Sequence, residues 1–252
     1  MLVTIDWLKD NLTNPNLVIL DTRLKAAFLD GHLPNSQSLS IEQVIKFDQY
    51  GSNLVEDEEK LSALFGSLGI DDTKTVIILG DSMDPSAARI AWTLLYMGHE
   101  DTHILNVNIS GLQENGFEFT EKFFTPKPLA FISKINPQIR IESELLNENL
   151  NDFVILDART PQEFMMGHLP NSKLIPFTEG ISFTGNLFQK KDLLGKLFSE
   201  NQISKDSEIV CYCMHGHRAS SLFFQLLIAG YDKVKLYDGS FIEWHGRGLP
   251  LE

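Results

Sequence analysis

A run of six residues carries the functional groups with the clearest chemistry in this sequence: Cys213-Met214-His215-Gly216-His217-Arg218. An apolar run at 208–212 precedes it and predicts a short buried strand, and residues 219–229 follow with apolar side chains at helical spacing. A cysteine in a tight turn that opens a helix meets converging backbone N–H groups and the positive end of the helix dipole. Because this environment stabilises a thiolate, we expect Cys213 to be the nucleophile of a covalent catalyst.

The rest of the loop supplies candidate substrate-binding residues, among which we include Met214. Gly216 permits a backbone conformation that other residues avoid, so that a substrate can approach closely. Arg218 lies at the end of the loop, where its fork can pair with a sulfonate or carboxylate. His215 and His217 either provide hydrogen bonds and positive charge near the substrate or are exposed turn residues without a chemical role. The spacing is too cramped for tetrahedral zinc ligation, and we expect no metal site.

Composition restricts the class of protein. The chain has 252 residues, 43% of them hydrophobic, and a formal net charge of −13, which argues against a nucleic-acid-binding protein. Its two cysteines, Cys211 and Cys213, are too close in sequence to form a disulfide framework, which favours a reducing compartment. The first residues lack the pattern of a secretory signal, and the apolar runs are shorter than a membrane span. We therefore expect a cytoplasmic protein without a membrane partner.

The elements that position the loop occur twice. Residues 18–39 and 154–175 are identical at 12 of 22 positions, at a constant offset of 136. A second pair of similar blocks, a strand and a helix ended by glycine, follows each of these at 75–98 and 209–230. Short Val/Ile/Leu runs that alternate with helical patterns predict an α/β fold of two similar domains, each with a mainly parallel central sheet flanked by helices. The predicted boundaries are 1–120 and 141–252, with a proline-containing linker at 121–140.

Only the second copy carries the nucleophile. When the two helices are aligned at their terminal glycines, Asp81 stands opposite Cys213. The corresponding loop, 81–86, contains no thiol, histidine or arginine, and its carboxylates would repel an anion. We therefore predict that the first domain is not catalytic. It would supply packing, and one wall of the substrate cleft is a further role that we consider for it, because a crevice between domains is a common place for small-molecule sites.

An Asp-x-Arg motif occurs in both copies, as Asp21 and Arg23 and as Asp157 and Arg159. Because the copy without a nucleophile also has it, we expect a structural ion pair in each domain. Arg159 remains a candidate substrate-binding residue as well, since it follows the carboxyl end of a strand, where sites form in parallel sheets.

We interpret four further residues as structural rather than catalytic. His32 and His168 belong to a Gly-His-Leu-Pro-Asn-Ser block that occurs in both copies, and we expect them to hold a turn. We interpret Cys211 as a buried small apolar residue, with a redox role as the alternative. Trp244 follows an Asp-Gly-Ser turn and is expected to pack on the second core.

In these motifs and their order, the chain resembles the tandem-domain rhodaneses, the thiosulfate or 3-mercaptopyruvate sulfurtransferases. The motifs are Thr-Ile-Asp-Trp-Leu at 4–8, the duplicated block described above, Cys-x-x-Gly-x-Arg-Ala-Ser at 213–220 and Leu-Tyr-Asp-Gly-Ser at 236–240. The resemblance implies an enzyme in which Cys213 takes sulfane sulfur from a small anionic donor as a persulfide. A thiophilic acceptor, cyanide or a thiol, then removes that sulfur. Such chemistry implies no metal and no organic cofactor.

The donor is less clear from this resemblance. Well-known thiosulfate-type members have a basic residue and an arginine where this chain has His215 and Glu163, and mercaptopyruvate-type members have Cys-Gly-Ser-Gly-Val-Thr as their loop. Thiosulfate is the first choice, because Arg218 and a protonated histidine suit a compact anion. The alternatives are 3-mercaptopyruvate as donor, or a persulfide carrier or redox module that serves a protein partner.

A second enzyme class has a similar loop. Cysteine-dependent phosphatases and arsenate reductases of related topology place one more residue between cysteine and arginine, which widens the loop for a tetrahedral oxyanion. The shorter spacing from Cys213 to Arg218 favours sulfur transfer over phosphate chemistry.

Overall fold

The computed structural model describes residues 2–252, which form two compact units. The first unit contains the chain up to Val44, Glu56–Ile135 and Ser182–Leu187, and the second contains Ile45–Val55, Asn136–Ile181 and Phe188–Glu252. The boundaries predicted from the sequence stay a prediction, and each unit also includes a short segment from the other half of the chain.

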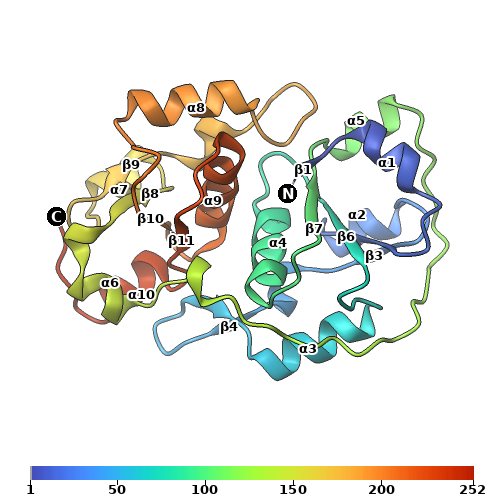
Figure 1. Ribbon diagram of the computed structural model, residues 1–252, viewed down its shortest axis with the longest axis horizontal. Helices are drawn as coiled ribbons and strands as arrows, with labels where there is room; N and C mark the ends of the chain where they lie inside the picture. The colour runs from blue at the N-terminus through green and yellow to red at the C-terminus, as the bar shows by residue number, and fades with distance from the viewer. Residues whose placement is uncertain (1) are drawn as a thin grey trace. The chain divides into compact units, whose positions relative to one another are not determined.

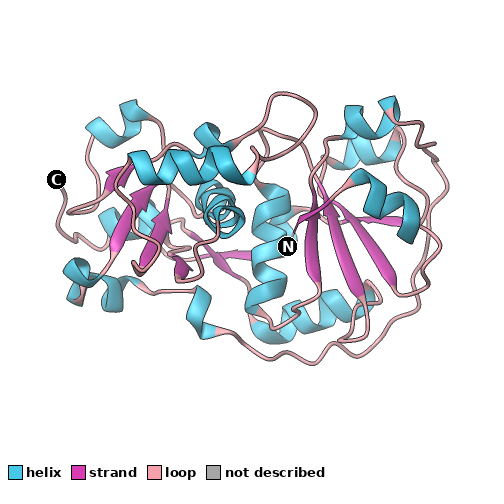
Figure 2. Ribbon diagram, turned by 45° about the horizontal axis from the view of Figure 1, so that its top comes forward, coloured by secondary structure: helices cyan, strands magenta, loops and turns pink. Residues whose placement is uncertain are grey.

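A five-stranded parallel sheet forms the centre of the first unit, in the order β1-β7-β6-β2-β3, with helices packed against it (Figures 1 and 2). The inner strands are continuous aliphatic runs and are almost entirely buried, as expected for a parallel sheet covered on both faces. The strands are β1 Leu2–Val3, β2 Leu17–Asp21, β3 Ser36–Ser38, β6 Thr75–Leu79 and β7 Thr102–Leu105. The helices are α1 Ile5–Asn11, α2 Lys25–Leu29, α3 Glu58–Ser67, α4 Ser86–Tyr96 and α5 Ile109–Glu114.

The second unit repeats this plan with a four-stranded parallel sheet in the order β11-β10-β8-β9. Its strands are β8 Val154–Asp157, β9 Lys173–Leu174, β10 Ile209–Tyr212 and β11 Val234–Leu236. Its helices are α6 Ser143–Glu148, α7 Pro161–Met165, α8 Lys191–Glu200, α9 His217–Ala229 and α10 Ser240–Gly246. The first unit also has a short 3-10 helix at Ile41–Gln43, and the second unit has three, at Pro137–Ile139, Leu150–Asp152 and Phe177–Gly180. The predicted fold, two α/β domains with mainly parallel central sheets, is confirmed.

One segment in each repeat belongs to the unit formed by the other repeat. In the first repeat it is an antiparallel hairpin of β4 Ile45–Phe47 and β5 Asn53–Val55, which packs within the second unit. In the second repeat it is Ser182–Leu187, which packs within the first unit, where the amide of Asn108 donates to the carbonyl of Gly185 at 2.8 Å. Both segments follow a 3-10 helix at corresponding places in the two repeats. The sequence analysis did not predict this exchange.

The duplicated histidines hold turns, as predicted. The ring of His32 stacks on Phe28 at a centroid distance of 3.8 Å, and its Nδ1 contacts the Phe28 carbonyl at 2.9 Å. In the second unit His168 stacks on Phe164 at 3.7 Å, and its Nδ1 contacts the Phe164 carbonyl at 3.2 Å. Both repeats therefore end the helix after the Asp-x-Arg motif in the same way.

Residues 121–136 contain no helix or strand and run along the first unit up to Ile135. Backbone hydrogen bonds of 2.9 Å attach them, from the amide of Leu129 to Gly66 and from the amide of Lys134 to Met97. Gly98, at φ +89°, ends α4 directly beneath the Lys134 carbonyl, where a Cβ atom would overlap with it. Glycine is therefore required here both for the helix end and for the close approach.

Each unit has its own apolar core. In the second unit Tyr237 and Trp244 lie edge to face at 6.1 Å within a cluster of fully buried side chains, so the predicted packing of Trp244 is confirmed. Within residues 2–252, no helix is long and apolar enough to cross a membrane.

Candidate active site

The cysteine loop joins the carboxyl end of β10 to the start of α9. All four residues of β10 are buried, so the strand delivers Cys213 to the edge of the sheet with its side chain 1% exposed. Gly216 precedes the helix at φ +85°, in the left-handed region, and α9 then begins at His217. The strand, the glycine turn and the helix follow the order that the sequence analysis predicted, and the helix begins two residues earlier than expected.

Hydrogen bonds fix the sulfur atom and the loop backbone. The amide of Gly216 donates to Sγ of Cys213 at 3.1 Å, which is the kind of contact that stabilises negative charge on sulfur. The amide of Cys213 donates to Oγ of Ser240 at 3.1 Å, and the amide of Phe241 donates to the Cys213 carbonyl at 3.0 Å. The start of α10 therefore holds Cys213 in place. Ser240 belongs to the Leu-Tyr-Asp-Gly-Ser motif, but nothing in that motif predicts this contact with Cys213.

Arg218 forms a two-pronged ion pair with Glu163. Its Nη1 and Nη2 donate to Oε2 and Oε1 of Glu163, each at 2.7 Å. The pKa of Arg218 is raised by these hydrogen bonds first and, after the opposing effect of burial, by the negative charge on Cys213. Arg218 therefore interacts with both the glutamate and the sulfur. Its predicted role in holding the substrate remains a prediction.

Glu163 is held from two sides. It is the third residue of α7, where Thr160 caps the helix and donates through its amide and its hydroxyl to Oε2 of Glu163 at 3.0 and 2.9 Å. The hydrogen bonds from Arg218, and then those from Thr160, lower the pKa of Glu163 to about 2 against the opposing effect of burial. The glutamate is therefore ionised across the whole physiological pH range.

The Asp-x-Arg motifs form the predicted ion pairs in both units. Nη2 of Arg159 lies 2.6 Å from Asp157 and donates to the Gly167 carbonyl at 2.8 Å. In the first unit, Nη2 of Arg23 lies 2.7 Å from Asp21 and donates to the Gly31 carbonyl at 2.9 Å. Because the two pairs are alike and each braces the turn after its helix, the motif has a structural role.

Arg159 also lies next to the cysteine loop. Burial lowers its pKa, but the hydrogen bonds and charge of Asp157 outweigh burial and leave the pKa raised. Its guanidinium stacks on Phe241 at 4.1 Å from the ring centroid, and Phe241 is bonded to the Cys213 carbonyl. A direct contact of Arg159 with substrate stays a prediction.

The two loop histidines have different surroundings. The Nδ1 atom of His215 is buried and has no hydrogen-bond partner within residues 2–252. Nε2 of His217 lies 2.8 Å from Nδ2 of Asn53, which is 8% exposed and belongs to β5 of the hairpin. Sequence reasoning missed Asn53, because 164 positions separate it from its partner.

A cavity of about 280 Å³ lies beside the loop in the second unit. Its lining includes Met214, the residue after Cys213, together with the charged side chains of Arg159 and Glu163. The remaining lining residues are Met166, Phe241, His245 and Leu251. The structure therefore brings Met214, Arg159 and Glu163 to one cavity, and most of the cavity wall is apolar.

Cys211 lies inside the sheet and is fully buried. Burial is the main cause that raises the pKa of its thiol, and the charge of Cys213 raises it further. A thiol in this setting is protonated and unreactive, which agrees with the interpretation of Cys211 as a packing residue.

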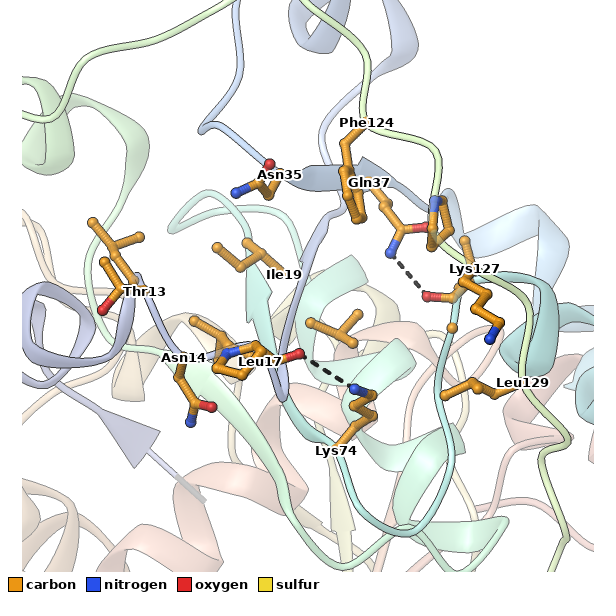
Figure 3. Close-up of a pocket in the computed structure, with 16 residues that line it drawn as sticks. Thr13, Asn14, Leu17, Ile19, Asn35, Gln37, Lys74, Phe124, Lys127 and Leu129 are labelled. Atoms are coloured by element: carbon orange, nitrogen blue, oxygen red, sulfur yellow. Dashed lines mark hydrogen bonds between the residues drawn. The ribbon is translucent and has the colours of Figure 1, made fainter.

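A second cavity, of about 560 Å³, lies in the first unit and is shown in Figure 3. Leu17 and Ile19 of β2, and Phe124 and Leu129 of the linker, contribute apolar surface, and Lys74 donates to the Pro15 carbonyl at 3.3 Å. None of its lining residues is a cysteine or a histidine. Its lining contains no residue of the cysteine loop, so it is not part of the site around Cys213.

A parallel-sheet unit with a cysteine loop at a strand's carboxyl end, preceded by a similar unit without the cysteine, defines a tandem α/β protein. A family model for the rhodanese-like domain matches residues 4–115 and again residues 142–247. The chain belongs to the rhodanese-like domain family.

Curated relatives extend over the same two domains. The sulfur carrier protein TtuD of Thermus thermophilus is 28% identical, covering 100% of this chain and 96% of its own length. The 3-mercaptopyruvate sulfurtransferase of Escherichia coli is 26% identical over 99% of this chain and 97% of its own. The thiosulfate sulfurtransferase of Azotobacter vinelandii is 26% identical over 94% of this chain and 91% of its own. The relatives therefore differ in the donor that their names state.

A solved structure supports the same assignment. The crystal structure of SseA from Escherichia coli, described as a 3-mercaptopyruvate sulfotransferase with the rhodanese fold, superposes with a TM-score of 0.84 at 25% identity. The superposition covers 95% of this chain and 98% of that one. The similarity thus includes both units and is not limited to the cysteine loop.

Proposed function

We propose that the chain is a sulfurtransferase that takes sulfane sulfur from thiosulfate, holds it as a persulfide on Cys213 and passes it to a thiophilic acceptor. The observation that carries this proposal is the position of the Cys213 sulfur. It lies at the start of α9, 3.1 Å from the Gly216 amide, and Arg218 is the second residue of that helix. The named sulfurtransferases among the relatives support the same reaction class.

The reaction has two balanced steps. The Cys213 thiolate attacks the outer sulfur of thiosulfate, the sulfur–sulfur bond of thiosulfate breaks, and sulfite leaves with the bonding electron pair. Cyanide or a thiolate then attacks the outer sulfur of the Cys213 persulfide, and the cysteine leaves as a thiolate. The two half-reactions form a ping-pong cycle, and no electron is gained or lost overall.

The protein's contribution is electrostatic. The attacking thiolate and the persulfide both carry negative charge on sulfur, at the N-terminal end of α9, where the helix dipole favours it. The Gly216 amide and the Arg218 guanidinium act on that charge in a buried setting, where solvent screens little. We expect further loop amides to contact the outer sulfur of the persulfide.

Turnover with cyanide tests the proposal. The full-length chain with thiosulfate and cyanide is expected to form thiocyanate, and Cys213→Ser is expected to abolish it. Cys211→Ser is the matched control, because it removes the buried thiol two residues away and should keep the rate within about threefold. Hydrolysis of an aryl phosphate that is lost in Cys213→Ser, without any thiocyanate, would instead assign the chain to the phosphatase class.

A second donor, 3-mercaptopyruvate, is favoured by one specific observation. Both terminal nitrogens of Arg218 are bound to Glu163, so this guanidinium offers less positive charge to a dianion than an unpaired one would. Mercaptopyruvate carries a single carboxylate charge. A donor panel that compares thiosulfate and 3-mercaptopyruvate by kcat/KM separates the two.

The acceptor is a further part of the proposal. A protein partner is supported by the relative that is named as a sulfur carrier. In that case, Cys213 loads quickly with sulfur but turns over slowly with cyanide or small thiols, and a cell extract restores turnover. The two free cysteines suit a reducing compartment, and we propose the cytoplasm as the location.

A further inference from the structure

The guanidinium groups beside the cysteine loop are both bound to carboxylates. Arg159 lies 2.6 Å from Asp157, and Arg218 donates two hydrogen bonds of 2.7 Å to Glu163. A donor anion that approaches Arg218 therefore meets a guanidinium whose charge is already largely balanced. It must share Arg218 with Glu163 or displace this carboxylate.

The Glu163 carboxylate does not move away easily. Its Oε2 atom accepts from Arg218 and from both the amide and the hydroxyl of Thr160, the residue that caps α7. The side chains of Glu163 and Arg218 are only 26% and 24% exposed. A carboxylate bound from two sides and partly shielded from solvent keeps its negative charge in the site when a donor enters.

In the cavity beside Met214, a donor also meets the negative charge of Glu163. Glu163 lines it directly, and the surrounding wall is mostly apolar, from Met166, Phe241 and Leu251. Arg159, which lines the cavity, and Arg218, which is paired with Glu163, attract an anionic donor, and Glu163 repels it. Because Coulomb energy is proportional to charge, the repulsion is twice as large for a dianion as for a monoanion at the same position.

We propose that Glu163 sets the donor charge that this site accepts, by weakening the binding of dianionic donors and favouring singly charged organic donors of sulfane sulfur. This inference rests on the proposed function and names the substrate class within it. Glu163 acts as a specificity residue and takes no part in bond making. Thiosulfate remains a donor, but a poorly bound one.

A purely structural role for Glu163 predicts a different outcome. If the residue only caps α7 and braces Arg218, its loss affects all donors to the same degree. Glu163→Gln separates the two roles, because glutamine at this position also completes a helix cap with Thr160 but carries no charge. Glu163→Met fills a similar volume without charge and serves the same comparison if the first variant does not fold.

Two donors that differ by one charge provide the test. Thiosulfate is a dianion, and methanethiosulfonate, in which a methyl group replaces one oxygen, is a monoanion. Cys213 attacks the same outer sulfur in both, and sulfite or methanesulfinate leaves. We measure kcat and KM for each donor, with cyanide as acceptor, in the full-length wild type, Glu163→Gln and the control Glu144→Gln. The control removes one carboxylate that pairs with Arg247 at 2.6 Å, outside the cavity.

The expected result is a change in preference. Glu163→Gln raises kcat/KM for thiosulfate at least tenfold relative to methanethiosulfonate, mainly through a lower KM, and Glu144→Gln leaves the ratio within twofold. Equal changes for both donors, or an equal effect of Glu144→Gln, overturn the inference while the proposed function stands. If neither donor loads sulfur onto the wild type or onto Glu163→Gln, the proposed function itself is wrong.

Discussion

Within the cysteine loop, Gly216 has the backbone conformation that most requires a glycine. Its φ of +85° is strained for any residue with a Cβ atom, and its amide is the donor to the Cys213 sulfur. Gly216→Ala is expected to destabilise the fold by about 1–2 kcal/mol and to reduce persulfide formation at least tenfold, because the strain rotates this amide away. Denaturant unfolding and the rate of sulfur loading measure the two effects.

Gly248→Ala is the control for that substitution. Gly248 also lies in the second unit, at φ +68°, and an added Cβ atom meets no other atom within 4 Å. Gly248→Ala should lose a similar amount of unfolding free energy to Gly216→Ala and keep the wild-type rate of sulfur loading. Equal losses of activity in both variants would show that the effect of Gly216 is general destabilisation.

The ion pair between Glu163 and Arg218 gives a pH dependence with a definite sign. The pKa of Glu163 falls from 4.5 to about 2 on folding, so the folded state binds this proton less tightly than the unfolded state. The stabilisation is complete above about pH 5 and is lost as the pH falls from about 4.5 to 2. The difference in unfolding free energy between wild type and Glu163→Gln should be constant from pH 8 to 5 and decrease toward pH 3. A difference that does not change over this range contradicts the assignment.

At the residue scale, local patterns were predictable and distant partners were not. The position of Cys213 between a strand and a helix, the positive φ of Gly216 and the Asp157–Arg159 pair follow from neighbouring sequence and from the internal repeat. The position of Glu163 was recognised as unusual from the sequence, but its contact with Arg218, 55 residues away, required the tertiary structure. The same holds for Asn53 and His217.

The hairpin at Ile45–Val55 is the element with the most direct influence on the cysteine loop from outside the second repeat. The amide of Val55 donates to Asp238 at 2.8 Å, Asn53 contacts His217, and Tyr50 lies against Gly246, where a Cβ atom would come within 2.6 Å of its ring. These contacts lie at the base (Val55), at the start of β5 (Asn53) and at the tip (Tyr50) of the hairpin. The hairpin therefore positions the first residue of α9.

Loss of the Tyr50 contact at the hairpin tip is expected to lower both stability and activity. Tyr50→Ala is expected to lower the unfolding free energy by about 1–3 kcal/mol and to reduce kcat at least threefold through the altered position of His217. Phe47→Ala, in the same hairpin but with a side chain that is 70% exposed, should change stability by less than about 0.5 kcal/mol. Chemical denaturation and turnover of the two variants decide this, and similar effects of both would exclude a specific role for the tip.

Elements of the two sheets were predictable because their aliphatic runs are continuous and occur twice. The helix end at Gly230, at φ +88°, was predictable for the same reason. The membership of the hairpin was not, because its strands of three residues each carry only a weak alternation and do not indicate which core they join. The tertiary fold, and not the local sequence of the hairpin, determines that it is buried in the unit of the other repeat.

At the scale of the whole molecule, the second repeat does not contain everything that its unit needs. A fragment of residues 136–252 lacks the hairpin, and Asp238 and His217 lose partners on it. We expect this fragment to load sulfur at least tenfold more slowly than the full chain, or to unfold without a cooperative transition. Circular dichroism and loading kinetics measure both properties, and wild-type kinetics in the fragment would refute the expectation.

The first repeat is expected to contribute no reacting group. Asp81 stands where the second repeat has Cys213, in the loop between β6 and α4. Asp81→Ala in the full chain should therefore leave turnover within about twofold, as for most exposed substitutions. A large loss of kcat would assign a catalytic role to the first unit.

Intact-mass spectrometry after brief exposure to thiosulfate addresses the identity of the sulfur-carrying atom most directly. The full-length chain should gain the mass of a single sulfur atom, peptide mapping should locate it on residue 213, and cyanide should remove it. A chain that acquires no sulfur from thiosulfate, methanethiosulfonate or mercaptopyruvate, or that carries it on Cys211, would contradict the account.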